Sequence, residues 1–64
     1  MRILILPGKR EAEKRFSGKA EELVREMGMK PDEVIVLRNG KPIPIDECVS
    51  DNDEITLLRV SSGG

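Results

Sequence analysis

The 64-residue sequence contains no histidine, tryptophan or tyrosine, only one phenylalanine, and a single cysteine, Cys48. These absences exclude the common catalytic bases, cysteine zinc clusters and intramolecular disulfides. The scarcity of aromatic side chains argues against a stacking surface for single-stranded nucleic acid. A net charge of −1 argues against a broad phosphate-binding surface. We therefore expect no resident metal or cofactor and no direct binding to nucleic acid.

No apolar run reaches the length of a signal peptide or a membrane span, so we expect a cytoplasmic protein that does not contact membranes. The length is near the lower limit for a domain that folds without metal or disulfides. With 38% hydrophobic and 36% charged residues, the core must be small and the surface densely charged. The sequence thus predicts one domain over residues 1–60, followed by a tail over residues 61–64.

The hydrophobic pattern predicts one helix among several strands. From Lys19 to Met27 the apolar residues recur at helical spacing, and Gly28 is placed for a left-handed helix end. Alternating or two-faced apolar runs predict the strands, with Asn39-Gly40 as a tight hairpin turn. Ser17-Gly18 could cap the helix. The expected strands are residues 1–6, a polar edge strand over 10–16, residues 34–38, an edge strand with two prolines over 41–44, and residues 54–60; residues 45–53 are expected to form a loop.

A single helix can cover only one face of such a sheet. Because the strands at residues 1–6, 34–38 and 54–60 are apolar on both faces, the other face should keep an apolar patch, which is typical of a partner-binding surface. Ordinary exposed aliphatic residues are the alternative. Strand alternation alone does not decide which set of side chains faces outward.

The final residues, Ser61-Ser62-Gly63-Gly64, follow directly on the last expected strand. They have no apolar group to pack and lose much backbone entropy on ordering, so we expect a flexible tail. Fully extended, it would reach about 13 Å, thin enough to enter a narrow active-site channel. A frayed chain end is the simpler alternative.

Two further features have simple interpretations. Most lone cysteines behave as small, inert hydrophobic residues, and no basic cluster near Cys48 favours its thiolate, although a role in sulfur handling stays open. The acidic run over residues 51–54 lacks the ligand spacing of a calcium site and is interpreted as a solvated turn.

The element order and the Gly63-Gly64 ending together resemble the ubiquitin-like β-grasp proteins, and most closely the sulfur carriers ThiS and MoaD, the ubiquitin-related modifier and the small archaeal modifier proteins. Three stretches carry the resemblance: residues 20–28, 32–44 and 57–64. It implies an α+β fold, a mixed sheet of four to five strands with the helix over residues 19–27 packed on one face. It further implies that Leu37, Leu58 and Val60 face outward and contact partners, while Val34, Val36, Ile55 and Leu57 lie beneath Leu23, Val24 and Met27.

The resemblance also implies a function. An E1-like enzyme, using its own ATP and Mg²⁺, would adenylate the carboxylate of Gly64, with Gly63 beside it in the active-site channel and Arg59 available to guide docking. The product would be a thiocarboxylate for sulfur transfer to tRNA or a cofactor, or an isopeptide bond to lysine. Partners would be the adenylating enzyme and a sulfur acceptor or conjugation target; the chain itself would be a monomer and not an enzyme.

Two other functions remain open from the sequence. The first is a noncovalent β-grasp module that binds through its aliphatic sheet face, with the Gly-Gly ending incidental. The second is a small RNA-binding β-grasp domain, against which the acidic pI near 5.4 and the missing aromatic residues count.

Overall fold

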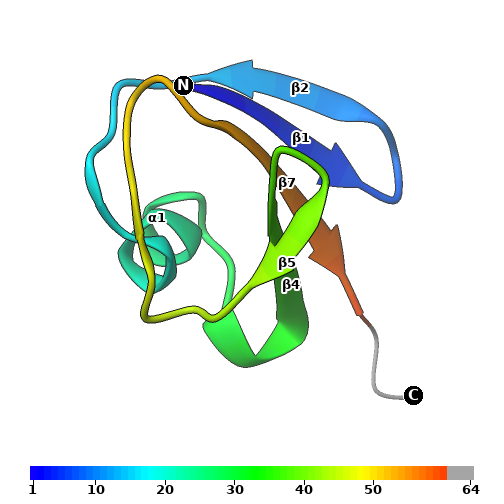
Figure 1. The fold of residues 1–64 in the computed structure, drawn as a ribbon. Coiled ribbons are helices and arrows are strands. Elements are labelled where there is room, and N and C mark those ends of the chain that lie inside the picture. The colour runs from blue at the N-terminus through cyan, green and yellow to red at the C-terminus, as the bar shows by residue number, and fades with distance from the viewer. Residues whose placement is uncertain (61–64) are drawn as a thin grey trace.

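A computed structural model describes residues 1–60, so the expected tail over residues 61–64 lies outside the described residues. One helix and a mixed five-stranded sheet make up most of the fold, as the sequence predicts for a ubiquitin-like β-grasp protein (Figure 1). In chain order the elements are β1 (Arg2–Leu6), β2 (Arg10–Glu13), β3 (Gly18–Lys19), α1 (Ala20–Glu26), a 3₁₀ turn (Pro31–Glu33), β4 (Val34–Arg38), β5 (Lys41–Ile43), β6 (Cys48–Val49) and β7 (Glu54–Arg59).

The large sheet has the strand order β2-β1-β7-β4-β5. β1 and β7 lie parallel at its centre, and the other neighbouring pairs are antiparallel. β2 and β5 are therefore the edge strands, which confirms both edge predictions. β2 ends at Glu13, three residues before the predicted end at Phe16.

The core lies between α1 and one face of this sheet. Ile3, Leu23, Ile55 and Leu57 are completely buried, together with Ala20 and Val24. Val34, Val36, Val49 and Met1 complete the buried set, and Met27 is partly buried against it. The predicted core is confirmed. Burial of these aliphatic side chains is the main driving force available to so small a domain.

The start of α1 differs from the prediction. The helix spans Ala20–Glu26, one residue shorter at each end than expected. Its N-cap residue is Lys19, not Ser17 or Gly18, and no side-chain hydrogen bond caps it. Instead, the Ala20 N–H donates to the Glu47 carbonyl at 2.9 Å and the Glu21 N–H to the Ile45 carbonyl at 2.8 Å. The predicted loop over residues 45–53 thus contains β6, which pairs with β3, and the residues just before β6 provide the acceptors that the helix start needs.

The two predicted turns agree with the structure. Gly28 follows the helix with φ +80°, and Asn39 and Gly40 both have positive φ between β4 and β5. These are the left-handed conformations that a helix end and a two-residue hairpin require. No helix among residues 1–60 is long and apolar enough to cross a membrane.

Candidate functional site: the outer sheet face

The face of the sheet opposite α1 carries an apolar surface. Side chains alternate along each strand, so the neighbours of the core residues project away from the helix. Val60 continues this alternation after β7 ends, and its N–H donates to the Glu33 carbonyl at 2.8 Å. We call the set the outer face; it consists of Leu4, Leu6, Ile35, Leu37, Leu58 and Val60, with Thr56 among them.

The strand register places these residues in rows across the sheet. Thr56 pairs with Leu4 on β1 and with Leu37 on β4, whereas Leu58 pairs with Leu6 and Ile35. Ile35 and Val60 are the most exposed, at 40% and 41%. The other four aliphatic residues are half-buried by one another.

The outer face changes from polar to apolar along β7. At the start of that strand the outward row is polar, because Glu54 pairs with Arg2 and its backbone bonds to Asn39. Toward the end of β7 the rows become aliphatic, and Val60 is the last described residue. The apolar surface therefore lies at the end of the sheet where β7 ends.

The structure brings three of the predicted contact residues to this face and separates the fourth. Leu37, Leu58 and Val60 lie on it, as expected. Arg59 pairs with the buried Val34 and therefore projects to the opposite side of the sheet, where it is exposed. Gly63 and Gly64 lie outside the described residues. The alternation along the strands does not show which set of side chains faces outward, so Leu4, Leu6 and Ile35 could not be identified as outward-facing from the sequence. Their orientation is known only once the side of the sheet on which α1 packs is known.

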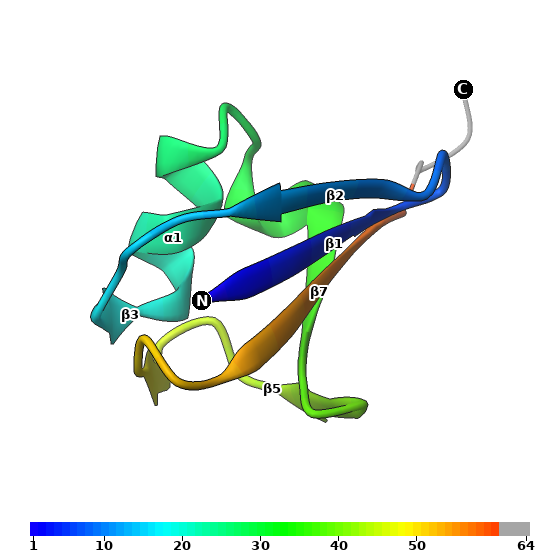
Figure 2. The ribbon, with the colours of Figure 1, turned by 90° about the horizontal axis from the view of Figure 1, so that it is seen from above.

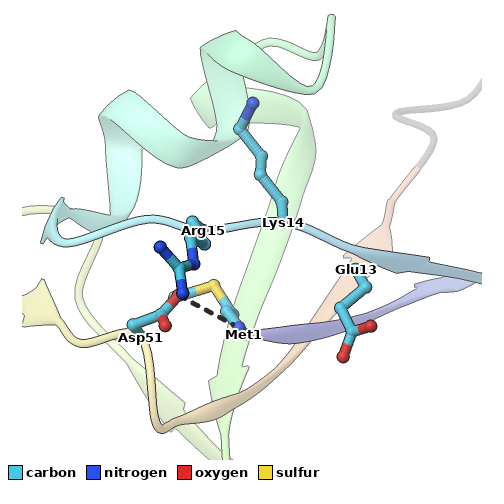
Figure 3. Close-up of a pocket in the computed structure, with 5 residues that line it drawn as sticks. All are labelled: Met1, Glu13, Lys14, Arg15 and Asp51. Carbon is cyan, nitrogen blue, oxygen red and sulfur yellow. Dashed lines mark hydrogen bonds and ion pairs between the residues drawn. The ribbon is translucent and has the colours of Figure 1, made fainter.

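A second, polar site lies at the other end of the molecule, near the start of β1. The Asp51 carboxylate accepts a hydrogen bond from the Phe16 N–H at 3.1 Å. It also accepts an ion-paired hydrogen bond from the Met1 amine at 3.1 Å (Figure 3). The pKa of Asp51 is lowered, first by the Phe16 hydrogen bond and then by the Met1 amine. The acidic run is interpreted from the sequence as a solvated turn; residues 51–53 do form a turn, but Asp51 and Asp53 accept hydrogen bonds within the protein. Residues 1–60 contain no group of three or more potential metal ligands.

Cys48 is exposed in β6, where it pairs with Lys19. Its carbonyl accepts a hydrogen bond from Arg38 at 3.2 Å, and the same guanidinium pairs with Glu47 at 2.7 Å. These contacts use the backbone and not the thiol, so they give Cys48 a structural position without assigning it any chemistry.

Comparison with known proteins gives consistent matches. The family model for small archaeal modifier protein 2 matches residues 6–61. The chain is 40% identical to small archaeal modifier protein 2 of Haloferax volcanii over 47 residues, which cover 73% of this chain and 70% of that protein. It is 28% identical to sulfur carrier protein TtuB of Thermus thermophilus over 62 residues, 97% of this chain and 95% of TtuB. An uncharacterized protein of Archaeoglobus fulgidus is 35% identical over 43 residues, 67% of this chain and 63% of that protein.

Proposed function

Because this chain belongs to the small archaeal modifier protein 2 family, we propose that it is a covalent carrier whose Gly64 carboxylate is activated by an E1-like enzyme. At the level of class it is a ubiquitin-like sulfur carrier or small protein modifier. In this proposal the chain is the substrate of the activating enzyme and not a catalyst, and it works in the cytoplasm.

The position of the aliphatic rows carries the proposal. Leu58 and Ile35 form the row nearest the end of β7, and Val60 continues it to the last described residue. An enzyme that binds this surface contacts Val60, four residues before Gly64 in the sequence. The outer face then provides the binding energy, while the glycines reach the reacting atoms without a side chain to block a narrow channel.

The first chemical step is activation. A carboxylate is a poor acyl donor because its leaving group would be oxide. Attack by the Gly64 carboxylate oxygen on the α-phosphorus of ATP breaks the bond to pyrophosphate and gives an acyl-adenylate, whose AMP is a good leaving group. The activating enzyme supplies ATP and Mg²⁺, which neutralises charge on the phosphates.

The acyl-adenylate can then react in two ways. The terminal sulfur of a persulfide attacks the acyl carbon and AMP leaves, which gives an acyl disulfide. A second thiol then attacks the inner sulfur of the original persulfide, forms a disulfide with it and releases the thiocarboxylate. Alternatively, a lysine amine attacks the activated carbon to form an isopeptide bond, releasing AMP directly or the enzyme thiol of a derived thioester. The names of the two relatives support both uses, sulfur carriage in TtuB and modification in the Haloferax protein.

A matched pair of isoleucines tests the role of the outer face. Ile35 lies on it and is 40% exposed, whereas Ile45 lies in the connection between β5 and β6 and is 37% exposed. Ile35→Glu places a charge against the activating enzyme, so ATP–pyrophosphate exchange with the E1-like enzyme of the same source should fall roughly tenfold or more in kcat/KM.

Ile45→Glu makes the same chemical change at nearly the same exposure and should leave the exchange rate close to that of the unmodified protein. Thermal unfolding of both variants checks that each keeps its fold. Equal exchange rates for the two variants would contradict binding through the outer face.

A further inference from the structure

The two edges of the five-stranded sheet differ in what their backbones offer a partner. Arg38 and Lys41 flank the two-residue turn, so they form a hydrogen-bonded pair. Because the two kinds of pair alternate, the next pair, Leu37 with Pro42, is not hydrogen-bonded. Pro42 therefore directs its nitrogen to the outside of β5. Since proline has no N–H, this edge lacks a donor where an added strand needs one.

The β2 edge keeps its donors. The Lys14 N–H donates to the Met1 carbonyl at 3.0 Å, which makes this a hydrogen-bonded pair. By alternation, Ala12 with Ile3 and Arg10 with Ile5 are the hydrogen-bonded pairs of β2 and β1. Glu11 and Glu13 belong to the non-hydrogen-bonded pairs, so their N–H and carbonyl groups point away from β1 at the free edge.

Nothing among the described residues covers this edge. Glu11 and Glu13 are exposed, and no backbone hydrogen bond outside the β1–β2 ladder is found for either of them in residues 1–60. A hollow of about 240 Å³ lies beside them, lined also by Arg2 and Ala12. Figure 2 shows β2 running alongside β1, its neighbour in the sheet. The edge is thus open to strand addition.

The side chains along β2 and at Lys14, which follows it, alternate between the two faces of the sheet. Lys14 points toward α1, where its amine pairs with Glu26 at 3.1 Å, while Glu13 points the opposite way (Figure 3). Glu11 lies on the same side as Glu13. An added strand would therefore meet two carboxylates on one face. On the other face it would meet the small Ala12, which packs against the core, between the cationic side chains of Arg10 and Lys14.

We propose that the free edge of β2 binds an extended segment of a partner protein that pairs with the backbone of Glu11 and Glu13 and carries lysine or arginine at alternate positions. Basic side chains facing Glu11 and Glu13 form favourable cross-strand pairs, and apolar ones between them cover Ala12. Glu11 and Glu13 project to the same side of the sheet as their β1 partners Leu4 and Arg2. The site nevertheless uses neither Gly64 nor the aliphatic residues of the outer face as its contacts.

A second copy of this chain is the alternative occupant. In a symmetric antiparallel pairing of two β2 edges, the register with Glu11 opposite Glu13 sets only like charges across from each other at these positions, which is destabilising. The registers with Glu13 or Glu11 opposite itself also place Glu11 opposite Arg15 or Glu13 opposite Lys9, so charge alone does not exclude them.

Backbone amide NMR with a blocked seven-residue peptide of alternating lysine and valine tests the proposal. The peptide should shift the Glu11 and Glu13 amide signals and slow their hydrogen exchange, while leaving β5 unaffected. A peptide with glutamate in place of lysine should bind roughly tenfold more weakly.

Charge reversal provides the matched variants. The double variant Glu11→Lys/Glu13→Lys should lose roughly tenfold in affinity for the lysine peptide and gain affinity for the glutamate peptide. Asp32→Lys/Asp46→Lys changes the net charge equally at exposed positions outside β2 and should keep the original preference. Thermal unfolding confirms that both variants fold.

Three outcomes would overturn the proposal. The first is equal binding of the two peptides, or of the two double variants to the lysine peptide. The second is a set of shifts that avoids Glu11 and Glu13. The third is a concentration-dependent change at these amides without any peptide, which would make a second copy of the chain the occupant.

Discussion

At the scale of single residues, Asp51 shows how one surface carboxylate holds distant segments together. It lies in the turn between β6 and β7 and accepts hydrogen bonds from the Met1 amine and from the Phe16 N–H. Met1 and Phe16 lie in the first part of the chain, whereas Asp51 lies near its end. Their contact fixes the start of β1 and the segment that leads from β2 to the helix.

We predict that Asp51→Asn lowers the melting temperature at neutral pH, because the neutral amide loses the ion pair with the Met1 amine. Asp46→Asn changes an exposed aspartate that makes no ion pair among the described residues and should have little effect. Calorimetry or circular dichroism measures both. A melting temperature for Asp51→Asn equal to that of Asp46→Asn would contradict the role of this contact.

The pH dependence follows from the lowered pKa of Asp51 in the folded protein. A carboxyl with a depressed folded pKa stabilises the fold fully above its unfolded pKa, near 3.8, and this contribution is lost as the pH falls through the lower folded pKa. The difference between the unmodified protein and Asp51→Asn should therefore be largest near neutrality and shrink below pH 3.8.

The residue-scale features differ in how far the sequence reveals them. Burial of Leu23 and Val24 could be read from helical spacing. The outward positions of Leu37 and Leu58 needed a family resemblance, because β4 and β7 are apolar on both faces. The partners of Asp51 could not be predicted, because they depend on where chain segments far apart in the sequence meet.

At the scale of elements, α1 ends where a left-handed residue reverses the chain. Gly28 has φ +80°, and no atom lies within 4 Å of where a Cβ would be placed. Any cost of adding a side chain there is therefore backbone strain alone.

We predict that Gly28→Ala lowers the free energy of unfolding by about 1 kcal/mol, the cost of the left-handed conformation for a residue with a Cβ atom. Urea unfolding measures it. Gly18→Ala should cost more, because its φ is +152° and the new Cβ would also lie 3.3 Å from the Phe16 ring. If the free energy of unfolding of Gly28→Ala were unchanged or raised, this would contradict a left-handed conformation at residue 28.

Short elements were the ones the sequence did not reveal. β3 and β6 have two residues each, too few for any periodic pattern to show. Their pairing places the Glu47 and Ile45 carbonyls against the first turn of α1, so a local rule for helix capping gave the wrong cap at Ser17-Gly18. The longer strands and both edge strands were predictable because alternation, charge and proline act locally.

At the scale of the whole molecule, the fold separates its surfaces. The helix covers one side of the sheet, the aliphatic outer face occupies the other, and that face becomes most apolar where β7 leads into residues 61–64. The β2 edge lies apart from that end row, at the margin of the sheet. One partner can therefore bind the outer face and draw in the final glycines without using the open edge.

The intact mass of the protein after incubation with ATP, a persulfide donor and the E1-like enzyme of its source tests the central claim most directly. The account predicts a mass increase corresponding to one oxygen exchanged for sulfur, or a conjugate if an acceptor lysine is present. Deleting Gly64 should abolish either product without changing the melting temperature. An unchanged mass, together with no ATP–pyrophosphate exchange, would contradict covalent carriage and leave noncovalent binding through the outer face as the function.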